Sequence, residues 1–532
     1  MNCTTTHLSY EQTGYFSKII TDYLKADEKL HPFYAHPVSV EGVKAAIEER
    51  RQFKTDRNLL VNELQKQYNA VEISAKIKTN ITALSKENTF TICTAHQPNI
   101  FTGHLYFIYK ILHAIKLAEQ LTTALPAYNF VPVFYMGSED ADLEELGHIY
   151  LFGEKYDWKT KQTGAVGRMK VDKALIKLIE TISGQLLVYP YGKEIISLLK
   201  DCYKEGEIIE QASFKLINAL FAAHGLLVLL PDNAVLKKAF IPVVEKELAE
   251  EFSHKAVSAT VVAFPAEYKV QASGRELNLF YLTDDNRERI EKVNGQWSMV
   301  DSAKKFSADG IAKELSDHPE RFSPNVILRP VFQELILPNI AFIGGGGEIA
   351  YWFELKKVFE AVKVPFPVLV LRNSFMVISK EMNNSKEKLN FNSTDLFKKE
   401  LDLVNELVGR ETKLQLSLER EKKTLVEFYQ QLKSTSGAVD ATLGNHTAAL
   451  EVNALKKIEA LEKKMLKAER KKFEAQQRQL HKLKSQLFPH NSLQERIENI
   501  LPFYAKQGAA FIKMLYENSL GLEQEFCIVE EK

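Results

Sequence analysis

The chain has 532 residues, of which 45% are apolar and 26% are charged, and its 69 basic and 69 acidic side chains cancel to a formal net charge of zero. This length exceeds what one hydrophobic core normally serves, so we expect two or more domains. The balanced charge gives no electrostatic reason to expect binding to nucleic acid or to an anionic membrane.

The sequence carries no targeting or membrane signal. No apolar run approaches the roughly 20 residues that span a bilayer, and the N-terminus lacks a basic stretch followed by an apolar one. The four cysteines, Cys3, Cys93, Cys202 and Cys527, are scattered without metal-binding spacing, which is typical of a reducing cytosol. We predict a soluble cytoplasmic protein without a metal centre, and with neither nucleic acid nor a membrane as partner.

The first strong pattern is a strand, a polar turn and a helix. Helical apolar spacing predicts a packing layer over residues 1–88, and the β-branched run Thr89–Thr94 then predicts a buried strand of a parallel sheet. An amphipathic helix begins near Thr102. Free backbone N–H groups and the positive end of the helix dipole meet at such a turn, which favours a phosphate or a carboxylate. The candidate site residues here are His96, Gln97, Asn99, Gly103, His104 and Tyr106.

Three carboxylates follow the second predicted strand, at residues 130–136. They are Glu139, Asp140 and Asp142. Open α/β sheets place their sites at the carboxyl ends of strands, so these groups could hold Mg²⁺, bind an ammonium group or act as a general base. The alternative is an ordinary capped helix start, because acidic residues also favour the first turn of a helix.

A third buried strand is predicted at residues 226–230, between two inserts. The first insert, near residues 151–225, has a hairpin-like start and includes Arg168, which we expect to be exposed on a turn. Pro231-Asp232 should end the strand and cap a helix that runs to Glu251. The second insert, near residues 255–322, contains short β-like pieces that predict antiparallel strands.

Four glycines separate a strand and a helix later in the chain. Residues 339–343 predict a strand, Gly344 to Gly347 follow with Glu348, and a helix begins at Ile349. Each glycine costs up to about 1 kcal/mol of conformational entropy, so either a ligand approaches the backbone there or the helix packs tightly on the strand. Gly345 to Ala350 matches the dinucleotide fingerprint, but the next strand ends in Arg372 and lacks the acid that binds a ribose. Further candidates in this region are Arg329, Tyr351 and Trp352.

Residues 381–490 differ in kind from the rest. Heptad spacing over residues 401–432, a turn at 434–437 and a second long helix predict an antiparallel coiled-coil hairpin, and such hairpins often dimerise. Residues 491–532 should pack back on a core formed by residues 1–380. Ser492 and Glu495 have the spacing of a capping box, and a helix at 505–518 and a strand at 526–529 follow.

Six ordered motifs give the chain its family resemblance. They are HQPNIFTGHLYFIYK, VPVFYMGSEDADLEELGHIYL, GAVGRM, HPERFSPNVILRP, LPNIAFIGGGGEIAYWFELKKVF and LFPHNSLQERIENILPF. With the helical hairpin they cover essentially the whole length, and the chain resembles the cysteine-adding enzymes of bacillithiol biosynthesis. Gln97, Gly103 and Tyr106 match the family pattern, whereas His96 and His104 depart from it.

The resemblance implies an α/β fold and an activity. The fold is a Rossmann-like parallel-sheet core with two connecting-peptide inserts and a coiled-coil arm that forms a homodimer. The activity joins cysteine to the amine of a malate–glucosamine conjugate, as a ligase that uses ATP or another nucleotide. The chain has neither a HIGH nor a KMSKS motif.

These implications lead to a mechanistic hypothesis. His96 and the three carboxylates are candidates for catalysis, with Glu139 or Asp140 deprotonating the amine, and Arg329 and Arg372 would bind malate carboxylates. Amides around Gly344–Gly347 would hold anions. A nucleotide, with Mg²⁺ if needed, could sit there or against Asn491, Ser492, Gln494 and Arg496. Two alternatives remain: an NAD(P)-dependent enzyme, and a coiled-coil scaffold whose polar loops do not converge.

Overall fold

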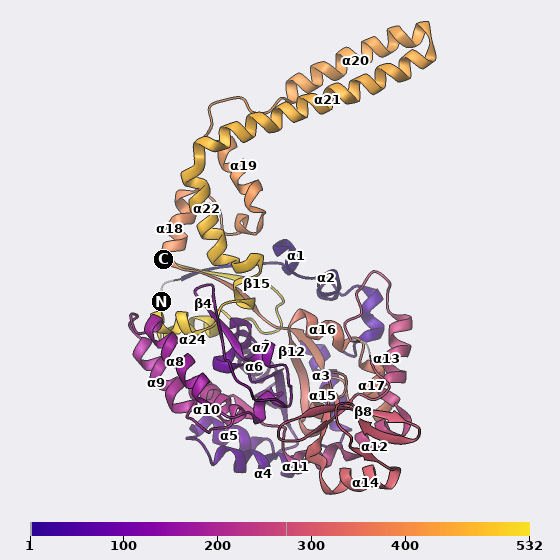
Figure 1. Cartoon of the computed structure of the whole chain (residues 1–532), viewed down its shortest axis with the longest axis vertical. Coiled ribbons are helices and arrows are strands. Elements are labelled where there is room, and N and C mark those ends of the chain that lie inside the picture. Colours follow the sequence, from indigo (N-terminus) through magenta and orange to yellow (C-terminus); the bar gives the residue numbers. More distant parts are fainter. Residues whose placement is uncertain (1–2, 273) are drawn as a thin grey trace. The chain divides into compact units, whose positions relative to one another are not determined.

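The computed structural model describes residues 3–272 and 274–532. They divide into two compact units (Figure 1). The core unit contains residues 3–376 and 492–529, and the helical unit contains residues 377–491 and 530–532. Among the described residues, no helix is both long enough and apolar enough to cross a membrane.

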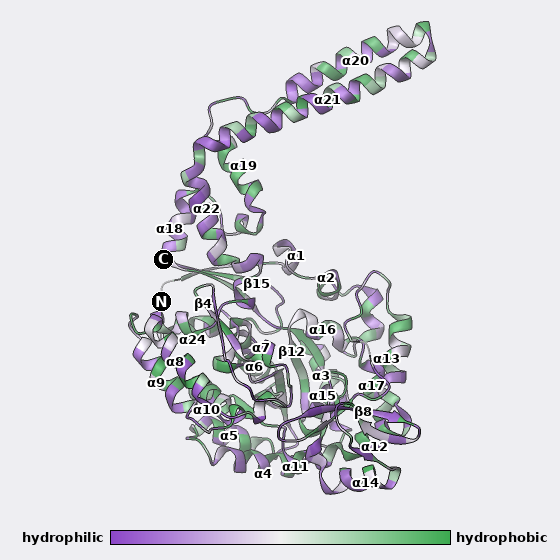
Figure 2. Cartoon of the chain, in the orientation of Figure 1, coloured by the Kyte–Doolittle hydropathy of each residue, from purple (hydrophilic) through white to green (hydrophobic). Residues whose placement is uncertain are grey.

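A five-stranded parallel sheet forms the centre of the core unit. Its order is β13 (Val368–Leu371), β12 (Asn339–Gly344), β2 (Thr89–His96), β3 (Asn129–Met136) and β6 (Leu227–Leu229). Every pairing is parallel, with Thr94 opposite Phe134 on one side and Ile343 on the other. The predicted strands and the Rossmann-like class are therefore confirmed. Figure 2 shows β12 as a green, hydrophobic arrow, as expected for a strand covered on both faces.

Helices cover the sheet and bury its apolar side chains. Helix α6 (Leu105–Ala124) connects β2 to β3, and Ala114 and Leu117 of α6 pack into one cluster with Ile92 of β2. Helix α3 (Val40–Arg51) adds Val43 to the same cluster. The predicted helical layer before residue 89 is confirmed, although it begins with a strand, β1 (Cys3–Leu8). The layer also contains α1 (Tyr10–Thr13), α2 (Lys18–Leu24), η1 (Glu28–Phe33), α4 (Arg57–Tyr68) and α5 (Ala75–Ala83).

The first insert is a hairpin followed by helices, as its pattern indicated. It contains β4 (His148–Leu151), β5 (Glu154–Asp157), η3 (Val166–Arg168), α8 (Lys173–Leu186), α9 (Gly192–Cys202), α10 (Ile209–Phe221) and η4 (Ala222–His224). The short α7 (Leu143–Leu146) precedes it. After β6 the predicted cap is wrong: Asn233, not Asp232, accepts the N–H groups of Val235 and Leu236, because Asp232 turns towards Arg168. The helix is also broken, into α11 (Ala234–Lys237), η5 (Lys238–Phe240) and α12 (Ile241–Glu250).

The second insert is an antiparallel sheet with two helices that the sequence did not predict. Residues 261–263, expected as β-like, lie in α13 (Phe252–Ala263), where Val257 and Thr260 share the buried face at helical spacing. Sheet order β10-β9-β8-β7-β11 confirms the antiparallel strands. The elements are β7 (Leu279–Leu282), β8 (Arg287–Val293), β9 (Gln296–Met299), β10 (Lys305–Phe306), α14 (Ala308–Asp317), η6 (Pro319–Arg321) and β11 (Phe322–Pro324). The chain returns to the sheet through α15 (Arg329–Ile336), and α16 (Gly346–Trp352) and α17 (Lys356–Val362) connect β12 to β13.

The helical unit contains the predicted hairpin with a different turn. Helices α20 (Glu419–Val439) and α21 (Ala441–Arg470) meet at Asp440, whose side chain caps α21, so the turn predicted at 434–437 is wrong. Gly437 instead packs against Gly444: a Cβ on Gly444 would lie only 3.4 Å from the Gly437 Cα. The absence of side chains at these two positions allows the two helices to approach each other. The first arm is interrupted between α19 (Glu400–Glu411) and α20. The unit also contains α18 (Lys380–Lys388), η7 (Asp395–Phe397), η8 (Lys471–Phe473), α22 (Glu474–Leu487) and η9 (Pro489–Asn491).

The C-terminal segment returns to the core unit. The predicted helix is split at Gly508, whose φ is +62°, into α23 (Leu501–Gln507) and α24 (Ala509–Glu517). Ser492 does not cap a helix, because the turn η10 (Gln494–Arg496) begins after Leu493. The predicted tail strand is confirmed as β15 (Phe526–Glu531), in a sheet of order β1-β15-β14, where β14 is Ser374–Ile378.

Candidate active site

One cavity of about 720 Å³ lies at the carboxyl end of the parallel sheet, and all five strands contribute to it. His96 ends β2, Glu139 and Asp140 follow β3, Pro231 follows β6, Gly345 follows β12 and Arg372 follows β13. Parallel strands end at the same edge of a sheet, which is where open α/β folds place their ligands. The loops at His96, Glu139 and Gly345 therefore converge. The enzyme hypothesis requires this convergence, whereas the scaffold alternative predicts that the loops lie apart. The remaining lining residues are Ala95, Gln97, Tyr106, Tyr135, Gly137, Glu145, Gln271, Ala272, Arg275, Phe280, Arg287, Pro324, Asn325, Val326, Arg329, Gly346, Gly347, Glu348, Tyr351 and Arg496.

The turn between β2 and α6 is strained and tightly held. Phe101 and Thr102 have positive φ values of 51° and 70°, and Gly103 follows at 61°. A Cβ on Gly103 would lie 2.8 Å from the Cβ of Asn99, so only glycine fits. Asn99 itself is buried and does not line the cavity. Asn499 donates from its amide to the carbonyl of Phe101 at 2.9 Å and also to that of Gly103.

His96 is a neutral group at this edge of the cavity. Burial, assisted by the positive charge of Lys110, lowers the pKa of His96 to about 3. Its Nδ1 lies 3.2 Å from the carbonyl oxygen of Gln97. His104 sits at the N-cap of α6 with its Nδ1 2.9 Å from the Ile497 carbonyl, and burial lowers its pKa too. His104 does not line the cavity, whereas Tyr106, two residues further along the chain, does.

The three predicted carboxylates separate into two lining groups and one cap. Asp140 accepts a hydrogen bond from the Gln97 amide at 3.0 Å and lies 3.8 Å from Arg287. Glu139 is buried and forms an ion pair with Lys237. Burial raises the pKa of Glu139, although Lys237 opposes this effect. Asp142 is exposed, does not line the cavity and accepts the Glu145 N–H as the cap of α7, which is the ordinary helix-start alternative.

The glycine loop is already occupied by a carboxylate of the chain. Glu348 accepts the N–H of Gly345 at 2.8 Å and pairs with the buried Lys110 at 2.5 Å. Burial raises the pKa of Glu348, but Lys110 outweighs it and keeps the pKa below its usual range. The start of α16 therefore faces Glu348 where a dinucleotide phosphate would have to lie, which weakens the NAD(P) alternative. Gly344 ends β12 and Trp352 stacks on Phe342 in the core at 4.4 Å, both outside the cavity lining.

Five arginines line the cavity, and they differ in how far they are neutralised. Arg372 is buried and pairs with Glu495 at 2.7 Å, and Arg287 faces Asp140. Arg329 is half-buried, and its guanidinium donates to Gln333 at 3.1 Å and to the Tyr351 hydroxyl at 3.2 Å, both neutral. Within the described part of the chain, Arg329 has no carboxylate within ion-pair distance. The other two arginines, Arg275 and Arg496, are exposed and likewise have none.

The residues proposed for a nucleotide lie where the chain passes from the helical unit to the core unit. Asn491 belongs to the helical unit, whereas Ser492, Gln494 and Arg496 belong to the core unit. Gln494 is buried, and of the three core-unit residues Arg496 lines the cavity.

Sequence reasoning missed the residues that act behind the lining. Lys110 and Lys237 are each 1% exposed and pair with Glu348 and Glu139. Lys110 had one signal, since it lies between Ile108 and Ile111 in the buried, mostly apolar first half of its helix. Arg287 comes from strand β8 of the second insert, and nothing local in the sequence shows that it faces the sheet. Arg168, expected to be exposed, instead makes a bidentate ion pair with Asp232 at 2.7 and 2.8 Å.

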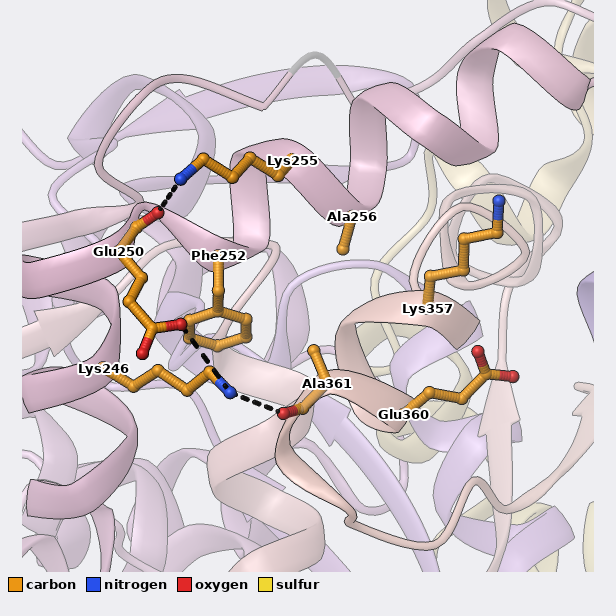
Figure 3. A pocket seen from close by; sticks show the side chains of 8 residues that line it. All are labelled: Lys246, Glu250, Phe252, Lys255, Ala256, Lys357, Glu360 and Ala361. Carbon is orange, nitrogen blue, oxygen red and sulfur yellow. Dashed lines mark hydrogen bonds and ion pairs between the residues drawn. The ribbon is translucent and has the colours of Figure 1, made fainter.

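A second, shallower pocket lies between α12, α13 and α17 (Figure 3). Its lysines already have partners: Lys246 donates to the Ala361 carbonyl at 3.0 Å, and Lys255 donates to the Glu250 carbonyl at 2.5 Å. No predicted site residue lines it, so the sheet-edge cavity is the candidate active site.

Comparison with known proteins decides the family. Residues 1–373 match the model described as the N-terminal Rossmann-like domain of bacillithiol biosynthesis BshC, and residues 375–531 match its C-terminal coiled-coil domain. The chain belongs to the bacillithiol biosynthesis BshC family. Both predicted architectures, the Rossmann-like core and the coiled coil, are thereby confirmed.

Relatives match the chain over nearly its full length. Proteins with the name "Putative cysteine ligase BshC" are 40% identical in Flavobacterium johnsoniae, covering 98% of this chain and 99% of theirs, and 38% identical in Cytophaga hutchinsonii, covering 96% of both. A Bacillus cereus relative with the same name is 25% identical, covering 96% of this chain and 98% of its own. The family membership confirms a role in bacillithiol biosynthesis.

Proposed function

We propose that this protein is a cysteine ligase that joins the carboxylate of L-cysteine to the amine of a malate–glucosamine conjugate, in the last step of bacillithiol biosynthesis. Family membership and the names of the relatives support a ligase of this pathway. The cavity supports the substrate, because it combines carboxylates that suit an amine with arginines that suit the malate.

The half-buried Arg329 is the observation that carries this proposal. A guanidinium that lines a cavity with only neutral partners keeps its charge available for an anionic ligand, and its planar fork matches a carboxylate. Malate offers two carboxylates, so we place one of them against Arg329. Arg372 lies beside Gly345, with its Nε 3.5 Å from the position of a Gly345 Cβ. Most of its other donors are taken by Glu495, Ser374 and the Asn373 carbonyl, so it serves as a secondary contact.

The carboxylates after β3 would bind the amine of the conjugate. Arg329 lies close to them, because its guanidinium is 5.5 Å from the centre of the Tyr135 ring on β3. Arg372 follows β13, which lies three strand spacings from β3, about 14 Å. A small conjugate could therefore contact both arginines while its amine faces the carboxylates. Asp140 or Glu139 would orient the amine and accept its proton, and the neutral His96 would accept a hydrogen bond without competing as a cation.

Amide formation from a carboxylate and an amine is uphill in water, so we propose that the reaction consumes ATP or a related nucleotide. When bound, the nucleotide would supply the activation of the cysteine carboxylate, as an acyl phosphate or an acyl adenylate. Arg275 and Arg496 line the cavity, and among the described residues no carboxylate lies within ion-pair distance of either, so their charges fit phosphates.

We also propose a cytoplasmic homodimer joined through the hairpin of α20 and α21. Helix α20 has no buried residue, although its heptad positions include Phe428 and Leu432, which are 53% and 41% exposed. A second copy would cover these side chains. The four cysteines are free thiols, which fits a reducing compartment.

Incubation of the purified protein with the malate–glucosamine conjugate, cysteine and each nucleotide tests the function. Mass spectrometry should detect the conjugate plus one cysteinyl residue, and the nucleotide product distinguishes acyl phosphate from acyl adenylate. Asp140→Asn should lower turnover at least about 100-fold without changing the fold, since it loses the carboxylate at the reacting amine. Asp142→Asn, outside the cavity, is the matched control. No product with any nucleotide would refute the ligase, and full turnover by Asp140→Asn would remove Asp140 from the mechanism.

A further inference from the structure

The loop that carries Glu139 and Asp140 is clamped by the turn η3. The N–H of Val166 donates to the Asp140 carbonyl at 2.7 Å, and the N–H of Gly167 donates to the Ser138 carbonyl at 3.0 Å. A Cβ on Gly167 would lie 2.4 Å from the Ser138 oxygen, so the approach requires glycine. The GAVGRM motif of the sequence therefore fixes the backbone of this loop.

Behind the loop, a buried lysine holds the Glu139 side chain. Lys237 is 1% exposed, and its ammonium group contacts the carboxylate of Glu139 and donates to the Glu320 carbonyl at 3.0 Å. Asp232 lies 3.7 Å from the same ammonium group and accepts the bidentate pair from Arg168. The turn η3 is therefore connected to Glu139 in two ways. Its backbone binds the residues on either side of Glu139, and its Arg168 side chain contacts Asp232, which lies beside Lys237.

The charges around Glu139 come from five elements. They are Lys237 on α11, Asp232 on the loop after β6, Arg168 on η3, Glu210 on α10 and Arg287 on β8, with Asp140 next in the chain and Tyr135 on β3. Burial, with the negative charge of Asp232 next, raises the pKa of Glu210 to about 8, so Glu210 is mostly uncharged at neutral pH. Among the described residues, Lys237 is the cation that contacts the carboxylate of Glu139 directly.

We propose that Lys237, anchored by Asp232 and Arg168, is a positioning residue that keeps Glu139 ionised and directed at the substrate amine. This inference rests on the proposed function, in which a carboxylate of this loop accepts the proton of the attacking amine. A buried carboxylate without a cation is driven to its protonated form, and a protonated Glu139 is far too weak a base to accept that proton. Lys237 itself touches no substrate and acts through Glu139.

Substitutions at Lys237 test the proposal through the pH dependence of turnover. Lys237→Met should lower kcat at least about 100-fold at pH 7 while the KM of the conjugate changes less than about threefold. The acid limb of its kcat profile should move upwards by at least about one pH unit, because Glu139 loses its cation and stays protonated to a higher pH. Lys237→Arg keeps a cation there and should restore kcat to within about tenfold. Exposed Lys238→Met is the matched control and should behave as wild type.

Two further measurements separate positioning from simple loss of folding and from failure of the proposed function. The double variant Lys237→Met with Glu139→Gln replaces a carboxylate that must bind a proton to stay buried by a neutral amide, so its thermal midpoint should return towards wild type while turnover stays lost. Carbodiimide labelling at pH 7, mapped by peptide mass, reports a protonated Glu139 without any ligase assay, and Lys237→Met should increase it at least about threefold. If the wild-type protein forms no product, the ligase function is refuted, but the labelling test of Glu139 still applies. If the wild-type protein is active, a Lys237→Met variant whose kcat profile keeps the wild-type pH dependence overturns the proposal. Carbodiimide labelling of Glu139 that Lys237→Met leaves unchanged also overturns it.

Discussion

At the scale of single residues, the local partners of a charged side chain separate binding from structural roles. Arg50 and Glu334 pair at 2.6 Å in the core, and both are buried. Among the described residues, Arg329 has neutral hydrogen-bond partners only, and it lines the cavity. Both arginines belong to helices, and the sequence contains no feature that separates them. The partner of each side chain, which only tertiary contacts supply, decides which one is available to a ligand.

Arg329→Lys should weaken binding of the conjugate specifically. Lysine keeps the charge but loses the planar fork, and a charge-assisted hydrogen bond contributes about 1.5–3 kcal/mol. The KM of the conjugate should therefore rise about 10- to 100-fold, while the KM of cysteine stays unchanged in steady-state assays. Arg289→Lys, on the second insert, is the control. An equal rise in both KM values would contradict the assignment of Arg329 to the malate.

Stability should depend on pH through His113. This side chain is buried, donates to the Gly521 carbonyl at 2.7 Å and accepts the N–H of Asn373 at 3.0 Å, and burial lowers its pKa to about 4. Because the folded pKa lies below the unfolded value of about 6.5, the unfolded chain binds more protons between these values. The stabilisation is complete above pH 6.5 and is lost as the pH falls towards 4.

Thermal midpoints measured between pH 7.5 and 4.5 test this effect. His113→Gln should be less stable at pH 7.5 but should lose less on acidification, by up to about 1.4 kcal/mol per pH unit. The exposed His31→Gln should keep the wild-type slope. A His113→Gln slope equal to that of wild type would show that His113 does not carry the effect.

At the scale of elements, strands and helix periods were predictable, and their ends were less so. The apolar runs of β2, β3 and β12 gave correct strands because a buried parallel strand must be apolar on both faces. The caps failed where a polar side chain had a distant partner. Asp232 and Glu495 both have good capping chemistry, but Arg168 and Arg372 take them into ion pairs.

Gly103→Ala should disrupt the turn between β2 and α6. Alanine resists the positive φ, at a cost of about 1–3 kcal/mol, and its Cβ would also displace Asn99. Both the thermal midpoint and kcat/KM should fall, because the same turn carries Gln97 to Asp140. Gly153→Ala is a matched control, since Gly153 has a φ of +83° but no atom within 4 Å of the added Cβ. Similar losses from both variants would show that strain alone, without the clash, explains the effect.

At the scale of the whole molecule, the open question is what covers the hairpin. Figure 2 shows green residues scattered among purple ones along α20 and α21, and Leu450 of α21 is 44% exposed. Phe428→Lys combined with Leu450→Lys should convert a dimer into a monomer, as measured by light scattering after gel filtration, because charged residues at these positions oppose apolar packing. Leu187→Lys, an exposed apolar site of the core unit, should leave the mass unchanged. A monomeric wild-type protein would refute the dimer.

The sequence by itself determined the class of the fold and the edge of the sheet where the site lies. Apolar runs of strand length, heptad spacing and polar residues placed directly after strands are local properties, and they suffice for a parallel sheet with loops at one end. Tertiary structure alone decided which polar groups remain available there. Lys237 neutralises Glu139 from behind, Lys110 neutralises Glu348, and Glu495 neutralises Arg372. Each outcome depends on a partner that is distant in the sequence or on packing between segments. Those contacts determine whether a charged side chain is free to bind a ligand.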